Sequence, residues 1–146
     1  MPIIEWTPDL SVGVDVLDAH HQRLLTLLDE VYQVLRTPRP ERTVGHVLDE
    51  MIAYTHYHFE EEERLLEAAG WPECETHRRS HAMLAEQVRA MMGDYAADPR
   101  GVLAAELFEF LSDWLIRHIR HEDMRYKDAL SPQTPRGGAN SATRGA

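Results

Sequence analysis

The stretch THYHFEEEER, residues 55–64, sets two histidines and four glutamates into ten residues. It lies within residues 43–69, a segment that contains one glycine and no proline and is followed directly by Gly70 and, two residues later, Pro72. The near absence of helix breakers before this stop predicts one long helix. Apolar residues recur along it at steps of three or four, which is typical of a helix with one buried face.

Two ionisable residues, His58 and Glu62, fall on that buried face, whereas His56, Glu60 and Glu63 fall on sides that are expected to face solvent. An unpaired buried charge costs several kcal/mol, so inward polar groups require partners. This segment alone therefore allows either a salt-bridged pair near the end of a bundle or a metal site. The predicted inward stripe is Leu48, Met51, Thr55, His58, Glu62, Leu65 and Ala69.

Length and composition restrict the class of protein. The 146 residues are enough for one domain with a substantial core, and 25 acidic against 15 basic residues give a net charge of −10. This charge disfavours binding to nucleic acid or to an anionic membrane. No apolar run approaches a membrane span, and the first ten residues lack the pattern of a signal peptide. The single cysteine, Cys74, excludes an internal disulfide and suits a reducing cytoplasm. We expect a cytoplasmic protein and a monomer.

The remaining sequence predicts three further long helices and two non-helical ends. Prolines, a glycine and alternating valines make residues 1–16 an extended arm, and residues 131–146 are rich in Pro, Gly and small polar residues, as in a disordered tail. Short connections between long amphipathic helices predict an all-α, up-down-up-down antiparallel four-helix bundle in residues 1–130, arm included. The helices are expected at about 17–36, 43–69, 73–97 and 102–130.

Each of the other three predicted helices also carries histidine on its buried stripe. His21 falls on the stripe of the first helix, His77 and His81 fall four apart on the third, and His118 follows on the fourth. As ordinary core residues, histidines on all four helices would each need a separate buried hydrogen-bond partner. A shared metal site explains them better.

The fourth helix contains an irregularity after His118. Its apolar stripe resumes at Tyr126. Counting back three residues from Tyr126 along the same face gives Asp123 rather than His121 or Glu122. Five residues on a regular helix turn about 140° off the starting face, whereas a π-type turn would restore the alignment. Asp123 is therefore a candidate inward carboxylate, while His121 and Glu122 remain alternatives on pattern alone.

The order of these candidate ligands resembles that of the hemerythrins, in particular the single-domain bacterial ones. SVGVDVLDAHHQRL (11–24), HFEEEE (58–63) and WLIRHIRHEDMRY (114–126) are similar to the sequences around the ligand groups in that family. The resemblance covers roughly residues 5–130 and fills all seven ligand positions. A departure is His20, which stands where a glutamine is common.

The resemblance implies a non-haem centre of two iron ions, bridged by an oxo or hydroxo group, that binds dioxygen reversibly. It implies that one iron keeps an open coordination position for dioxygen, on the side with two histidines. Structural zinc sites close at four ligands, whereas imidazole-rich ligation suits iron. By the resemblance, one iron is held by His77, His81 and His118, the other by His21 and His58, and both are bridged by Glu62 and Asp123.

Residues one, three or four positions from a ligand crowd the same side of a helix. Around the two-histidine iron this spacing selects five apolar residues as the walls of a dry oxygen pocket, and they match the pocket positions of the family. These residues are Leu24, Phe59, Trp114, Leu115 and Ile119.

We expect an oxygen carrier or store rather than an enzyme, with an oxygen-consuming enzyme as its partner. Ferritin-like di-iron proteins are carboxylate-rich, whereas this ligand set has five imidazoles and two carboxylates, which favours binding over O–O cleavage. The alternatives are a di-iron enzyme that reduces peroxide or nitric oxide, and an oxygen sensor. No output domain is recognisable in the chain, which makes the sensor the less favoured of the two.

Overall fold

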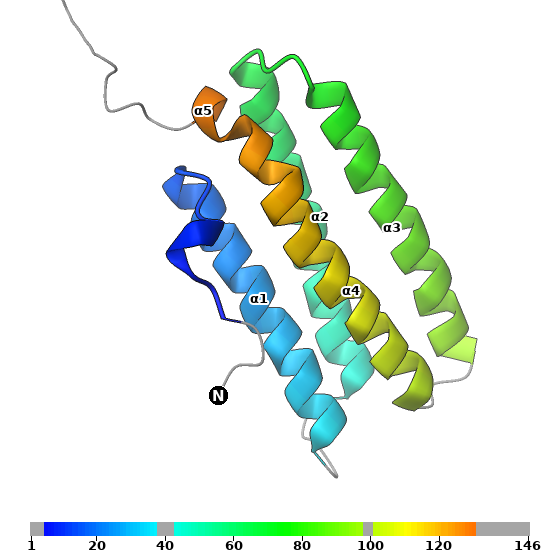
Figure 1. Ribbon diagram of the computed structural model, residues 1–146. Helices are drawn as coiled ribbons and strands as arrows, with labels where there is room; N and C mark the ends of the chain where they lie inside the picture. Colours follow the sequence, from blue (N-terminus) through cyan, green and yellow to red (C-terminus); the bar gives the residue numbers. More distant parts are fainter. Residues whose placement is uncertain (1–4, 38–42, 98–100, 131–146) are drawn as a thin grey trace, which may run out of the picture.

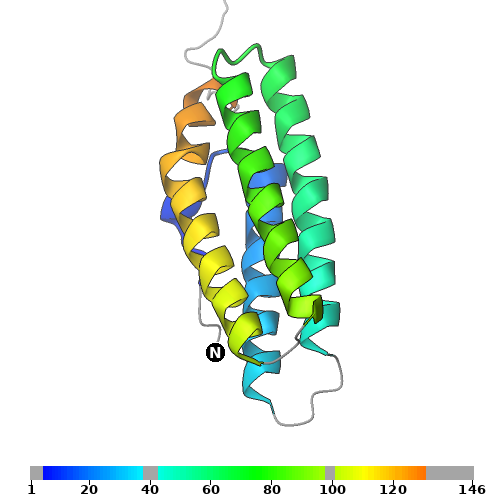
Figure 2. The ribbon, with the colours of Figure 1, turned by 90° about the vertical axis from the view of Figure 1, so that its right-hand side faces the viewer.

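A computed structural model describes residues 5–37, 43–97 and 101–130. Four long helices run side by side with alternating direction (Figures 1 and 2), which confirms the predicted antiparallel four-helix bundle. The elements in chain order are η1 (Pro8–Leu10), α1 (Asp15–Arg36), α2 (Val44–Ala68), α3 (Cys74–Ala97), α4 (Gly101–His121), η2 (Asp123–Tyr126) and α5 (Lys127–Leu130).

The four long helices form a ring in which each one packs against two others. α1 contacts α2 and α4, and α3 contacts the same two helices from the other side. Side chains from all four helices therefore meet along the axis of the bundle, where the main apolar core lies. No helix in the described ranges has both the length and the apolar character needed to span a membrane.

The amino-terminal arm folds back onto α1. Asp18 accepts hydrogen bonds from the Ser11 hydroxyl at 2.5 Å and from the Val12 backbone N–H at 2.8 Å. Val12 is fully buried with Tyr126, near the far end of the chain. The prediction of a non-helical arm up to residue 16 was two residues too long, because α1 begins at Asp15, and the arm also contains the 3-10 turn η1.

Both ends of α2 are fixed by local chemistry. The Thr43 side chain accepts a hydrogen bond from the backbone N–H of His46 at 3.1 Å, which caps the helix at its start. Gly70 follows the helix with φ of 68°, and the N–H of Trp71 bonds back to the carbonyl of Leu66 at 3.1 Å. A left-handed glycine of this kind is a common helix stop.

The expectation of a continuous fourth helix over residues 102–130 was wrong. α4 ends at His121, Glu122 stays in the right-handed helical region but with φ stretched to −114°, and η2 begins at Asp123. The chain here contains no π-type turn. Because Asp123 follows a break, the phase of α4 no longer decides where its side chain points, and it is completely buried. The predicted disordered tail, residues 131–146, lies outside the described residues.

Candidate metal centre

The seven residues predicted as metal ligands come together in the middle of the bundle. Each of them is at most 3% exposed. The arrangement uses every long helix, because α1, α2, α3 and α4 all contribute histidine, α2 adds a glutamate and η2 adds an aspartate. The seven are His21, His58, Glu62, His77, His81, His118 and Asp123.

These residues form two overlapping groups, and in each the potential ligand atoms lie within 4.8 Å of one another. Both groups contain Glu62 and Asp123. The first, called here the three-histidine group, adds His77, His81 and His118. The second, called here the two-histidine group, adds His21 and His58.

Glu62 directs a different oxygen to each group. Its Oε1 lies 2.9 Å from His77 Nε2 and 3.2 Å from His81 Nε2. Its Oε2 lies 3.4 Å from His58 Nε2 and 3.6 Å from His21 Nε2. This division is the one expected of a carboxylate that bridges two ions.

Asp123 divides its oxygens in the same way. Its Oδ1 lies 3.0 Å from the Nε2 atoms of both His77 and His118. Its Oδ2 lies 3.1 Å from Nε2 of His21. Of the three inward candidates left open by the sequence pattern, Asp123 is therefore the one that reaches the centre. His121 is exposed and Glu122 is only partly buried.

The contacts of Asp123 are short, but they lack the geometry of hydrogen bonds. Both of its carboxylate oxygens, and both ring nitrogens of His21, are buried without a hydrogen-bond partner among the described residues. Such orphaned groups are costly inside a protein. Two ligand atoms that each lie roughly 2.1 Å from one octahedral ion, at a right angle, are themselves roughly 3.0 Å apart. The spacing and orientation of these atoms thus fit metal ions better than a hydrogen-bond network.

The carboxylates also change the acidity of the histidines. Burial opposes a charge on His21 and His77, yet Asp123 and Glu62 outweigh it and raise the pKa of His21 to about 9 and that of His77 to about 10. The pKa of His118 rises to about 9, again against burial and mainly through Asp123. Burial also opposes the charge on Glu62 and Asp123 and by itself would raise their pKa. The facing histidines nevertheless hold the pKa of both carboxylates well below the ordinary value. A metal ion would have to displace protons from these nitrogens.

Among the described residues, four further polar side chains contact the candidate ligands from outside, and the sequence pattern did not assign them this role. Tyr126 donates its O–H to Glu62 Oε2 at 2.7 Å, and the carboxylate of Glu63 lies 2.7 Å from His81 Nδ1. The expectation that Glu63 faces solvent was wrong. Arg78 Nε donates a hydrogen bond to the Glu63 carboxylate at 3.2 Å, and together with His81 it holds this side chain against the bundle. The other two are His20, 2.9 Å from His58 between Nδ1 atoms, and Glu122, 3.4 Å from Nδ1 of His118.

Of the five residues predicted to line an oxygen pocket, the two aromatic ones contact candidate ligands directly. Leu24, Leu115 and Ile119 are buried, as is Phe59, whereas Trp114 is partly exposed. The two aromatic rings stack on the three-histidine group: Phe59 lies 3.6 Å from the His81 ring centroid and Trp114 lies 4.3 Å from that of His118. Phe59 also lies 5.9 Å from the ring of His58, so it borders both groups.

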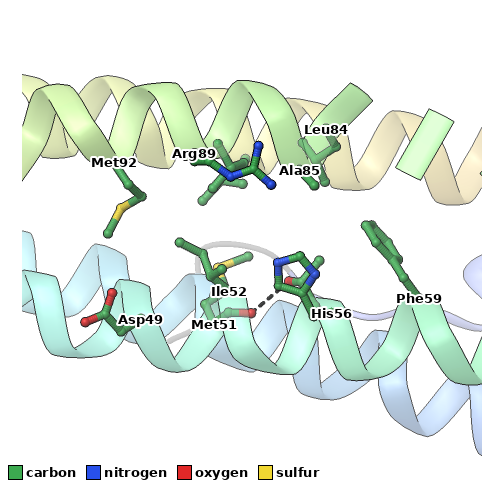
Figure 3. A pocket seen from close by; sticks show the side chains of 12 residues that line it. Asp49, Met51, Ile52, His56, Phe59, Leu84, Ala85, Arg89 and Met92 are labelled. Atoms are coloured by element: carbon green, nitrogen blue, oxygen red, sulfur yellow. Dashed lines mark hydrogen bonds between the residues drawn. The ribbon is translucent and has the colours of Figure 1, made fainter. Parts of the chain in front are cut away.

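A separate cavity of about 250 Å³ opens between α2 and α3 (Figure 3). Its floor is apolar and includes Met51, Leu84 and Phe59, while charged residues such as Asp49 and Arg89 stand at its exposed mouth. Phe59 is the only residue that the cavity shares with the predicted oxygen pocket. The candidate ligands do not line it.

Comparison with known proteins gives a consistent picture. The model of the hemerythrin HHE cation binding domain matches residues 12–130. A bacteriohemerythrin from Stenotrophomonas maltophilia is 37% identical over 130 residues, which are 89% of this chain and 83% of that protein. A bacteriohemerythrin from Pseudomonas aeruginosa is 30% identical over 135 residues, which again cover 89% of this chain and 83% of that protein.

The crystal structure of a wild-type hemerythrin has the same fold, with a TM-score of 0.79 at 24% identity over 88% of this chain and 98% of the other. The family model spans most of the bundle, and the relative from Stenotrophomonas maltophilia exceeds 30% identity over most of the chain. The chain therefore belongs to the hemerythrin family.

Proposed function

We propose that this protein binds dioxygen reversibly at a centre of two iron ions, and that it transports, stores or delivers oxygen rather than transforming it. The observation that carries the proposal is the division of Glu62 and Asp123, each of which offers one oxygen to each histidine group. A single ion would not require two carboxylates shared in this way.

The donor set indicates the metal. Seven ligand residues exceed the four of a structural zinc site. Five neutral imidazoles with two carboxylates suit iron better than they suit magnesium or calcium, which prefer oxygen ligands. In this proposal one iron is held by His77, His81 and His118, the other by His21 and His58, and both by Glu62 and Asp123.

The iron ions, when bound, supply the electrons that hold dioxygen reversibly. The protein's own contribution is to orient the ligands and to exclude water. Tyr126 fixes the Glu62 carboxylate through its O–H, and Glu63 fixes the ring of His81. Leu24, Leu115 and Ile119 are buried apolar residues. In this proposal they line the two-histidine side and keep water and protons away from it.

The test is anaerobic loading with ferrous iron, followed by absorption spectra through repeated cycles of oxygen and argon. A charge-transfer band that appears under oxygen and vanishes under argon is the expected result. Irreversible conversion to the ferric state, with turnover of peroxide or nitric oxide, would instead support the enzymatic alternative. A chain that retains one iron or none would contradict the di-iron centre itself.

A further inference from the structure

The outward-facing nitrogens of the candidate ligands have different partners in the two groups. In the three-histidine group, Nδ1 of His118 lies 3.4 Å from the Glu122 carboxylate, without the geometry of a hydrogen bond. Nδ1 of His81 lies 2.7 Å from the Glu63 carboxylate, within hydrogen-bond distance. Carboxylate partners of this kind orient a ligand imidazole and raise its basicity, and both effects strengthen its bond to a metal.

The two-histidine group has no such carboxylate within the described ranges. Nδ1 of His58 lies 2.9 Å from Nδ1 of His20, and the two rings are 2% and 5% exposed. Nδ1 of His21 has no hydrogen-bond partner among the described residues. The outer support of this group is therefore a single contact between two imidazoles.

The direction of this hydrogen bond follows from the side of His58 that faces the centre. Its Nε2 points to Glu62 at 3.4 Å, so Nε2 is the nitrogen available to a metal. A neutral imidazole that binds through Nε2 carries its proton on Nδ1. His58 thus donates from Nδ1, and His20 accepts at its own Nδ1, which makes His20 a neutral imidazole protonated on Nε2.

The surroundings of His20 hold it in this position. Its ring meets that of Tyr54 edge-on at 5.8 Å between centroids and that of Tyr57 at 5.2 Å. The ring of His58 crosses it at 84°. The accepting nitrogen is therefore held at a fixed place by packing, as an effective orienting group requires.

We propose that His20 is the positioning residue of the two-histidine group, and that its neutral hydrogen bond makes this half the weaker metal site, which fills second and empties first. The inference rests on the proposed di-iron centre and assigns it an order of loading. His20 holds His58 in the tautomer that binds metal, but its neutral ring lacks the negative charge that Glu63 places beside Nδ1 of His81.

The experiment titrates the metal-free protein anaerobically with ferrous iron and follows heat and absorbance, which should resolve a tight and a weaker step. Replacing His20 with Phe removes the acceptor and should weaken the second step by about 10- to 100-fold while leaving the first unchanged. The His20→Gln variant keeps an acceptor oxygen and should restore the second step. Glu63→Gln is the matched control, and it should weaken the first step instead.

A second readout does not depend on loading. In the metal-free protein, ¹⁵N NMR should find His58 protonated on Nδ1 in the wild type and in His20→Gln, and a mixture of tautomers in His20→Phe. Circular dichroism checks the bundle, and His20→Leu replaces the Phe variant if that ring disturbs the packing. The inference would be overturned if His20→Gln and the acceptor-free variants bound iron equally, or if the wild type took up both irons with equal affinity. Either result would leave the di-iron centre itself supported. A wild type that takes up one iron would overturn both.

Discussion

At the scale of the residue, the site depends on carboxylates that are buried, charged and yet available. Glu62 is completely buried, and the histidines around it, together with the O–H of Tyr126, keep it in the charged form against the cost of burial. The neighbours of Glu62 in sequence have no such surroundings, because Glu60 is exposed and Glu63 turns to Arg78 and His81. Residues of one type in one short run thus have three different roles.

This difference gives the first prediction. His58→Ala and Glu62→Ala should each reduce bound iron well below two per chain, because each removes an inward ligand atom. His56→Ala and Glu60→Ala are the matched controls, since both side chains are exposed, and they should leave the iron content unchanged. The measurement is metal analysis after anaerobic loading and desalting. Equal iron loss in His56→Ala and His58→Ala would mean that the wrong face of α2 had been assigned to the centre.

The second prediction concerns the apolar wall of the proposed oxygen pocket. Leu24→Asn and Leu115→Asn should retain both irons but shorten the lifetime of the oxygenated form, because a polar side chain admits water to the site. The decay of the oxygenated absorption band at fixed pH measures this lifetime, and an iron assay runs beside it. Unchanged decay in both variants would locate the pocket elsewhere, and loss of iron would show that these leucines are structural.

At the scale of the element, the end of α4 shows what a sequence pattern can and cannot provide. The slip in the apolar stripe after His118 indicated an irregularity, which the end of α4 at His121 confirms, and it left Asp123, His121 and Glu122 as inward candidates. It could not distinguish a π-type turn from a break followed by a 3-10 turn, because both move the stripe and only backbone contacts separate them. The N–H of Glu122 donates a hydrogen bond to the carbonyl of His118, and the N–H of Arg125 donates one to the carbonyl of Glu122.

The outer contacts of the site were harder to predict for a related reason. Helical periodicity assigns each residue to a face of its own helix, and in this way it identified the six candidate ligands that lie on the four long helices. His20 and Glu63 lie at the edge of a face, where their contacts depend on how far the neighbouring helix is rotated and displaced. The His20 contact crosses from α1 to α2, and the Glu63 contact crosses from α2 to α3. A single sequence does not specify those rotations.

The third prediction tests how η2 is joined to α2. Tyr126 is fully buried and donates to Glu62 across the bundle. Tyr126→Phe removes this hydrogen bond to a charged acceptor and should lower the free energy of unfolding of the metal-free protein by about 1.5–3 kcal/mol. Tyr57→Phe, at a half-exposed position, is the control and should change it by less than about 0.5 kcal/mol. Urea denaturation measures both, and equal stability of the two variants would contradict the anchoring role of Tyr126.

At the scale of the whole molecule, the centre lies where all four helices meet, so metal binding and folding should be coupled. Ligands that bind only the folded state stabilise it by mass action. The fourth prediction is a clearly lower melting temperature for the metal-free protein than for the iron-loaded protein, measured by calorimetry at equal protein concentration. Identical melting of the two forms would count against a site in the centre of the bundle.

The fifth prediction is that the metal-free protein loses stability as the pH rises above neutrality. His21, His77 and His118 have native pKa values of about 9, 10 and 9, against an ordinary value of 6.5 for unfolded histidine. The native state therefore binds protons more tightly than the unfolded state. The resulting stabilisation is complete below about pH 6.5 and is lost as the pH rises through 9 to 10. His58, whose pKa is lowered by burial, contributes the opposite effect only below about pH 6.5, so it does not alter this range.

Bound iron should remove this dependence, because the same nitrogens are then occupied by metal at every pH in the range. Melting temperatures of both forms at pH 6.5, 8 and 9.5 provide the measurement. The metal-free curve should fall with pH while the iron-loaded curve stays nearly level, so the gap between them should widen. A metal-free melting temperature that stays constant or rises over this range would mean that the histidines do not hold protons against Glu62 and Asp123. The short nitrogen–oxygen distances in the centre would then need a different explanation.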